Sequence, residues 1–117
     1  MTITLANLDQ ATPQEVFDQV TTHLLKQNKK SMRYEKSRNF CAYRSGNLKC
    51  AVGCLIDDDE YLPEMEASDW NDLIDNGYVK ATVHTRLITE LQNTHDTSSP
   101  VYWPDRLRKI VHDYRPL

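Results

Sequence analysis

Three cysteines lie close together in the chain, and their type and spacing come nearest to a chemical site. Cys41, Cys50 and Cys54 fall within CAYRSGNLKCAVGCLI at the spacing C-x8-C-x3-C. Structural zinc sites use four Cys or His ligands, often in C-x2-4-C pairs. Cys50 and Cys54, one helical turn apart, could join Cys41 across a turn to supply three thiolates. A fourth ligand would have to come from one of four histidines, which are all distant in sequence.

The neighbours of these cysteines favour packing over chemistry. Ala, Val, Leu and Ile surround the last two thiols, and free Cys is among the most often buried residues and packs as a small hydrophobe. We therefore expect core thiols, with no cofactor, and keep a metal site at Cys41, Cys50 and Cys54 as an alternative. The odd number of cysteines excludes complete internal pairing, so reduced thiols in the cytoplasm are the simplest interpretation.

Catalytic motifs are missing from the sequence. It holds no G-x-S-x-G nucleophile motif, and with three glycines it has neither a P-loop nor a dinucleotide fingerprint. Two His-Asp pairs, His95-Asp96 and His112-Asp113, could orient a base or bind a metal. Each is expected near a helix end, where such residues commonly cap or face solvent. We therefore expect no catalytic residue, and an enzyme is the least supported class.

The acidic run DDDE at 57–60 does not fit a calcium loop. An EF-hand loop that begins at Asp57 needs Gly at its sixth position and Glu at its twelfth. Leu62 and Ser68 stand there instead.

Charge is divided between two blocks, although the net charge is only -3 and the pI about 5.7. From Lys26 to Lys49 eight basic residues and one acid give +7, and from Cys50 to Val79 nine acids and no base give -9. Such blocks form interaction surfaces or solvated faces, or lie against each other in the fold. If the acidic block binds a partner, its residues are Asp57, Asp58, Asp59, Glu60, Glu64 and Glu66.

The basic block supports a different function. It interleaves cations with aromatic rings, and such a surface can hold phosphates while the rings stack bases. The acidic pI argues against nucleic-acid binding by the domain as a whole. The residues of this alternative site are Lys29, Lys30, Arg33, Tyr34, Lys36, Arg38 and Arg44.

Helical signals dominate the chain. Thr12, Pro13 and Glu15 form the N-cap, first position and capping box of a helix that should end near 28–31. Further helices are predicted over 69–76, 81–95 and from Trp103 onward, with loops at 32–39 and 94–100. A turn at 44–47 follows a short strand at 40–43. Residues 48–56 fit either a returning strand or a helix, and a short helix over 49–56 is favoured.

These elements predict a mostly helical α+β fold. We expect four to five helices, at most one small β-hairpin around residues 40–52, and a single domain over 1–117 with 1–11 as a flexible N-terminal arm. No apolar run approaches the roughly 20 residues that span a bilayer, so no membrane association is expected.

The pattern CAYRSGNLKCAVGCLIDDDEY, followed by EMEA, LQNTHD and W-x3-L-x2-I, resembles small uncharacterised open reading frames of bacteria and their phages. The likeness covers most of the chain from the first helix onward. It implies a compact cytoplasmic accessory protein, and no activity comes with it.

We therefore expect a non-enzymatic interaction protein, such as a phage accessory protein that binds and modulates a host macromolecule. A protein partner contacting the acidic block is favoured. The alternatives are RNA or single-stranded nucleic-acid binding by 26–49, and a metal or small-molecule site built from Cys and His.

Overall fold

The structure, a computed structural model, describes residues 2–35 and 38–113. It confirms the mostly helical α+β class. Four α-helices are described: α1 Pro13–Gln27, α2 Trp70–Asp75, α3 Thr85–Thr97 and α4 Trp103–Asp113. Short 3-10 helices precede or connect them: η1 Leu5–Gln10, η2 Gly53–Leu55, η3 Pro63–Met65 and η4 Pro100–Tyr102. The strands are β1 Met32–Glu35, β2 Arg38–Cys41, β3 Arg44–Ser45 and β4 Leu48–Lys49.

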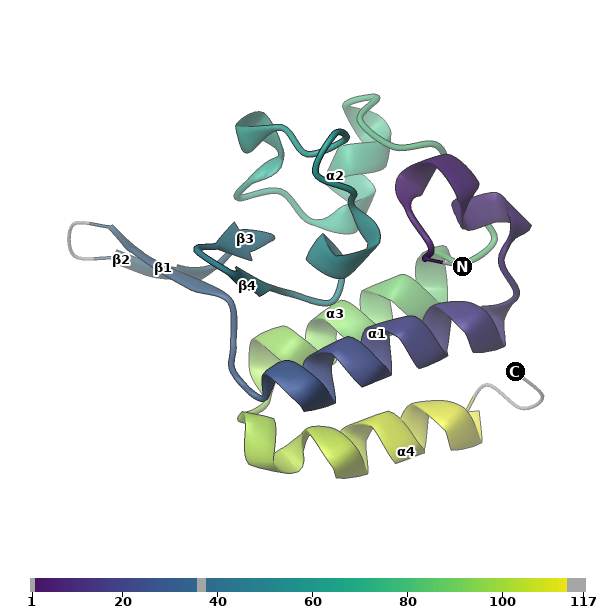
Figure 1. Cartoon of the computed structure of the whole chain (residues 1–117), viewed down its shortest axis with the longest axis vertical. Coiled ribbons are helices and arrows are strands. Elements are labelled where there is room, and N and C mark those ends of the chain that lie inside the picture. The colour runs from purple at the N-terminus through teal and green to yellow at the C-terminus, as the bar shows by residue number, and fades with distance from the viewer. Residues whose placement is uncertain (1, 36–37, 114–117) are drawn as a thin grey trace.

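Helices α1, α3 and α4 pack together as the base of the molecule (Figure 1). The segment from η2 to α2 lies over the other side of α1 and α3. One hydrophobic cluster joins these layers, and Trp103, Leu24, Leu55 and Leu91 are among its fully buried side chains. The arrangement leaves the charged segments between α1 and α2 on the outside of this core.

Helix α1 begins and ends as its sequence predicts. The Thr12 hydroxyl accepts from the Glu15 backbone N–H at 3.1 Å, and the Glu15 carboxylate accepts from the Thr12 N–H at 2.8 Å. These hydrogen bonds lower the pKa of Glu15. The helix ends at Asn28, whose left-handed backbone (φ 51°) turns the chain toward β1.

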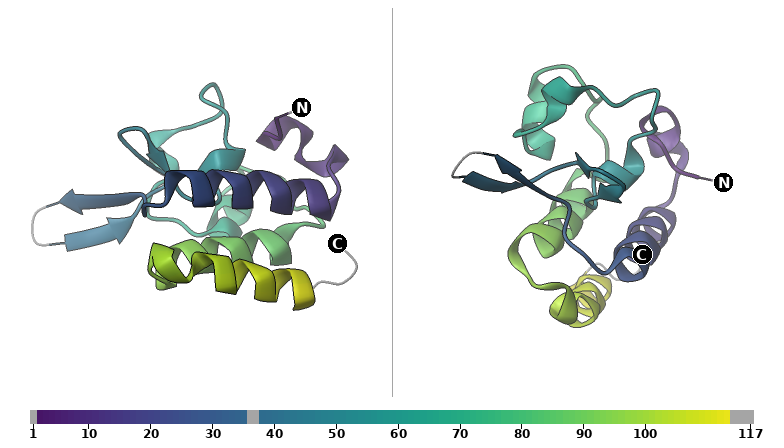
Figure 2. Two further views of the ribbon diagram at one scale, coloured as in Figure 1. Left: turned by 60° about the horizontal axis from the view of Figure 1, so that its bottom comes forward. Right: turned by 60° about the vertical axis from the view of Figure 1, so that its left-hand side comes forward.

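Two antiparallel hairpins are present in the described residues, where the sequence predicted at most one. β1 pairs with β2, with Met32 opposite Cys41, and β3 pairs with β4 around the Gly46-Asn47 turn. The β1–β2 hairpin projects away from the helices in both views of Figure 2. The sequence predicted a loop over 32–39 because this stretch is polar and basic as a whole. Within it, Met32 and Tyr34 alternate with Arg33 and Glu35, which is the period of a strand.

The segment after β4 is neither the strand nor the short helix over 49–56 that we expected. Lys49 ends β4, residues 51–52 form a turn, and η2 covers only Gly53–Leu55. Helix α3 also runs later than predicted, from Thr85 to Thr97, so His95 and Asp96 lie in its last turn and not in a loop. Val83, which the helix predicted over 81–95 would include, precedes α3 and is 90% exposed.

The N-terminal segment, for which we expected a flexible arm, contributes to the core. Ile3 and Leu8 are buried. The Ile3 N–H donates to the Gln19 side chain of α1 at 2.7 Å, and that side chain donates back to the Ile3 carbonyl at 2.8 Å.

Candidate functional site

The basic and acidic blocks meet along a junction between the hairpins and the segment that follows η2. Arg44, in β3, pairs with Asp58 at 2.6 Å and donates to the Ile56 carbonyl at 2.8 Å. Its guanidinium lies 4.7 Å from the ring centroid of Tyr61, a cation–π contact. Lys49 lies 3.9 Å from the same Asp58 carboxylate. Part of the basic block is therefore paired with part of the acidic block within the folded chain.

Glu66 is the centre of this junction. Its carboxylate accepts from the backbone N–H groups of Tyr43 (2.9 Å) and Arg44 (3.2 Å) and from the Tyr61 hydroxyl (2.6 Å). Arg33 adds an ion pair at 3.5 Å. The Glu66 side chain is only 9% exposed, so these four partners compensate for its burial. Burial and the hydrogen bond to Glu66 raise the pKa of Tyr61.

Glu60 holds the N-terminal segment to the rest of the molecule. Its carboxylate accepts from the backbone N–H groups of Leu5 (3.0 Å), Ala6 (2.9 Å) and Asp57 (2.9 Å). Leu5 and Ala6 open η1, whose first N–H groups have no partner within the helix. Glu60 therefore has a clear role in folding, as Glu66 does.

The other predicted acidic residues lie on the surface. Asp57, Asp59 and Glu64 are exposed, and the Asp58 side chain is 80% exposed despite its contact with Arg44. Leu62 lies among them and is 45% exposed. We call residues 57–66 the acidic lobe. It combines exposed carboxylates with the exposed apolar side chains of Leu62 and Pro63.

The predicted basic residues also divide into two groups. Arg33 and Arg44 belong to the junction, where the Arg33 Nε–H donates to the Arg44 carbonyl at 2.9 Å. Lys29 is exposed, and the half-buried Lys30 donates to the backbone carbonyl of Asp96 at 3.2 Å. Tyr34 is 72% exposed. Lys36 and the side chain of Arg38 lie outside the described residues.

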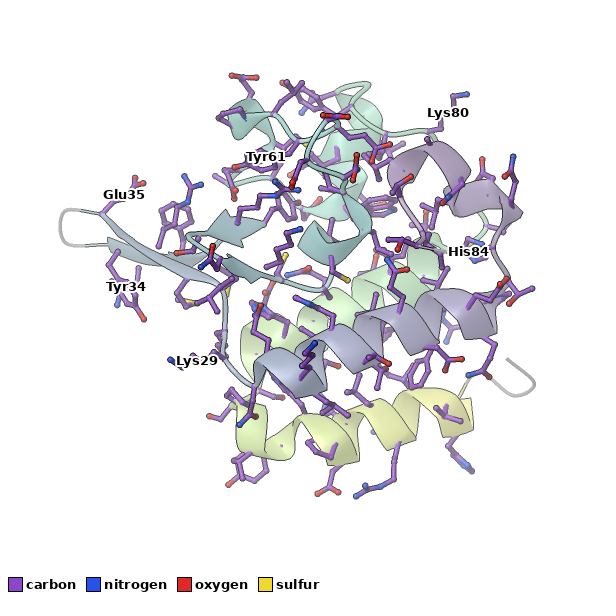
Figure 3. All side chains as sticks on the ribbon, in the orientation of Figure 1. Lys29, Tyr34, Glu35, Tyr61, Lys80 and His84 are labelled. Atoms are coloured by element: carbon purple, nitrogen blue, oxygen red, sulfur yellow. The ribbon has the colours of Figure 1, made fainter. Side chains whose placement is uncertain are left out.

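The two sides of the β1–β2 hairpin therefore face different surroundings. Figure 3 shows Tyr34 on the side of the hairpin that faces Lys29, and Glu35 on the opposite side, toward Tyr61 and the acidic lobe. This follows from strand geometry, because successive side chains point to opposite faces. Arg33 shares the face of Glu35 and reaches the Tyr61 hydroxyl at 3.3 Å.

Two of the three cysteines are packed as the sequence predicts. Cys50 is buried and its sulfur accepts from the Gly53 N–H at 3.3 Å. The Cys54 thiol donates to the Ala51 carbonyl at 3.1 Å. Burial raises the pKa of both thiols, that of Cys54 to about 12. Both are protonated at neutral pH, and a thiol in that form is a poor nucleophile and metal ligand.

Cys41 lies in a different cluster, which the sequence did not reveal. Its sulfur, a ring nitrogen of His95 and a carboxylate oxygen of Asp96 all lie within 4.8 Å of one another. We call these three residues the His95 cluster. Burial and the neighbouring Asp96 raise the pKa of Cys41 to about 11. The sequence signal was the His95-Asp96 dipeptide, but nothing in it indicates that β2 passes beside the end of α3.

His95 is fully buried and its two ring nitrogens are both engaged. Nε2 accepts from the Ser31 backbone N–H at 2.9 Å, and Nδ1 lies 2.7 Å from Asp96 Oδ1. The ring also stacks on Trp103, with centroids 5.6 Å apart. Gln92 donates to the same Asp96 oxygen at 2.7 Å and accepts from the Val52 N–H at 2.8 Å. These hydrogen bonds connect α3 to Ser31, just before β1, and to Val52, in the turn after β4.

The ligand types of the His95 cluster suit zinc, but its hydrogen bonds do not. A thiolate, an imidazole and a carboxylate are all zinc ligands. Because Nε2 of His95 faces an N–H donor, it carries no proton, so the neutral ring holds its proton on Nδ1. Nδ1, which lies beside Asp96, therefore has no free lone pair for a metal. This geometry favours a hydrogen-bonded anchor over a metal site.

None of the helices in the described part of the chain combines the length and apolar character needed to cross a bilayer. Comparison of the chain with protein-family models, curated proteins and solved structures finds no significant match.

Proposed function

We propose that this chain is a non-catalytic cytoplasmic binding protein whose acidic lobe engages a basic surface on a protein partner. The observation that carries the proposal is that the carboxylates of one acidic run have two different environments. Glu60 and Glu66 are used by the fold, whereas the carboxylates of Asp57, Asp59 and Glu64 face solvent. Folding does not account for these exposed charges.

Three further features support this role. Leu62 offers an apolar contact within a charged rim, a composition typical of interface centres. The thiols have raised pKa values, which disfavours nucleophilic chemistry. The resemblance to small phage and bacterial reading frames suits an accessory protein that modulates a host macromolecule. Acidic side chains would then accelerate encounter with a basic target and confer salt-sensitive specificity.

Affinity capture with a matched charge control tests the proposal. The variant D57N/E64Q/D59N removes three exposed carboxylates from the lobe. The control D18N/E90Q/D105N removes three exposed carboxylates from helices α1, α3 and α4, outside the lobe. We expect a partner that the wild type and the control capture from host cytosol at low salt, and that the lobe variant loses.

Nuclease treatment before capture identifies the kind of partner. A protein that stays bound after nuclease supports the proposal. Capture that survives in the lobe variant, or that disappears with nuclease, would show that the lobe is not the binding surface for a protein.

A further inference from the structure

A groove lies on the side of the β1–β2 hairpin that faces away from the acidic lobe. It has a volume of about 610 Å³, within the range of roughly 300–1,000 Å³ of ligand clefts. Lys29 and Lys30 line it from the linker after α1, and Pro100 lines it from η4. The hairpins contribute Met32, Tyr34, Ser45 and Leu48, and Asn28 lines the groove at the end of α1. We call this surface the lysine groove.

Side chains of β1 alternate between the two faces of the hairpin, so only every second residue of this strand lines the groove. Met32 and Tyr34 line the groove, whereas Arg33 points to Glu66 on the other face. Figure 3 shows Tyr61, whose hydroxyl donates to Glu66, across the hairpin from Lys29. Glu66 and Asp58 neutralise Arg33 and Arg44. The acidic lobe repels a polyanion, and this repulsion favours its approach to the lysines from the groove side.

The two lysines and the tyrosine supply different contacts. Lys29 is exposed, and Lys30 has one hydrogen bond, to the Asp96 carbonyl, which leaves two further ammonium protons. Tyr34 is 72% exposed, so its ring is open to a planar partner. Cations beside an open aromatic ring are the elements of single-strand recognition, in which lysines hold phosphates and the ring stacks a base.

We propose that the lysine groove binds single-stranded nucleic acid, with backbone phosphates at Lys29 and Lys30 and a base stacked on Tyr34. This goes beyond the proposed protein partner and uses a different surface. Of the five residues of the sequence pattern whose side chains the structure describes, the groove uses three: Lys29, Lys30 and Tyr34. An acidic polypeptide would satisfy the lysines but would not need the exposed ring, so the contribution of Tyr34 distinguishes the two ligands.

Fluorescence anisotropy with labelled oligouridine and oligothymidine of about 12 nucleotides, a length near the site sizes of single-strand binders, tests the proposal. We expect binding at low salt that weakens as salt rises, with a log–log slope of about -1.4 for two phosphates. Tyr34→Ala should weaken binding roughly fivefold or more. Lys29→Gln should flatten the slope by about 0.7. The control K80Q/K109Q, which removes two exposed lysines elsewhere, should leave binding unchanged.

Three results would overturn the proposal: no binding at low salt, wild-type affinity in Tyr34→Ala, or displacement of the oligonucleotide by polyglutamate at equal charge concentration. The last would assign the groove to an acidic polypeptide. Lys29 and Tyr34 are both exposed, so these variants should fold, and circular dichroism checks that they do. Acidic-lobe variants do not touch this surface, so failure here is distinguishable from failure of the proposed protein-binding function.

Discussion

The backbone N–H of Ser31 donates to Nε2 of His95 over 2.9 Å, between two residues that are both fully buried. This contact fixes the neutral tautomer of the ring, because a nitrogen that accepts a hydrogen bond cannot carry the proton. Nδ1–H is then the donor to Asp96, 2.7 Å away. The ring thus connects the start of the hairpin region to the last turn of α3.

Replacing His95 should destabilise the fold. His95→Ala leaves the Ser31 N–H without a partner and opens a cavity beside Trp103, so we expect a loss of about 3 kcal/mol in the free energy of unfolding. Asp96→Asn keeps an acceptor for Nδ1–H and should cost about 1 kcal/mol. His112→Ala, at an exposed position, should stay within about 0.5 kcal/mol of the wild type. Urea denaturation measures all three, and NMR of the ring nitrogens reports the tautomer. Protonated Nε2 in the neutral ring would contradict this account.

Cys41 should react slowly with alkylating agents. Its pKa of about 11 leaves roughly two-hundredfold less thiolate at pH 8 than an ordinary thiol with a pKa of about 8.5. Asp96→Asn removes the negative neighbour and should speed the labelling of Cys41. Mass spectrometry after timed exposure to iodoacetamide locates and quantifies the reaction. Labelling of Cys41 as fast as free glutathione would show that its thiol is not suppressed.

The raised pKa values of the thiols also predict how the stability of the fold changes at alkaline pH. Cys41 and Cys54 have folded pKa values of about 11 and about 12, above the value of about 8.5 expected for the unfolded chain. Their contribution is complete below about pH 8.5 and is lost as pH rises through the folded values, since the unfolded chain releases its protons first. The thermal midpoint should therefore fall between about pH 9 and about pH 11. In Cys41→Ala the fall should be shallower, and an equal fall would contradict this contribution.

Helix signals in the sequence predicted α1 well and the hairpin region poorly, for physical reasons. The ends of α1 depend on local hydrogen bonds, Thr12 with Glu15, that a short sequence pattern encodes. The His95 cluster depends on contacts between β1, β2 and α3, and no local pattern carries them. The charge pattern has a similar limit. The +7 and -9 blocks can be counted in the sequence, but the sequence does not show which carboxylates are used by the fold.

Variants of Glu66 and Glu64 test whether the folding and surface carboxylates of the acidic run differ in their contribution to stability. Glu66→Ala removes the acceptor for two backbone N–H groups and a tyrosine hydroxyl and takes away the carboxylate that pairs with Arg33. We expect a loss of about 3 kcal/mol in the free energy of unfolding. Glu64→Ala, at an exposed position two residues away, should change it by less than about 0.5 kcal/mol. Denaturant unfolding under identical conditions compares the two variants. Equal effects would remove the distinction between folding and surface carboxylates on which the proposed function rests.

Gly53 shows why the segment after β4 follows neither pattern expected from its sequence. A Cβ on Gly53 would collide with the backbone carbonyl of Tyr43, so only glycine allows η2 to pack this closely against the chain before β3. Gly53→Ala should therefore cost about 3 kcal/mol, because backbone must move to make room. Gly46→Ala is the matched control: Gly46 has open space around it but a positive φ of 59°, so alanine there should cost about 1 kcal/mol from backbone strain alone. Urea unfolding of both variants compares a steric cost with a conformational one. If Gly53→Ala were no worse than Gly46→Ala, the close approach of Gly53 to Tyr43 would not be a constraint on this fold.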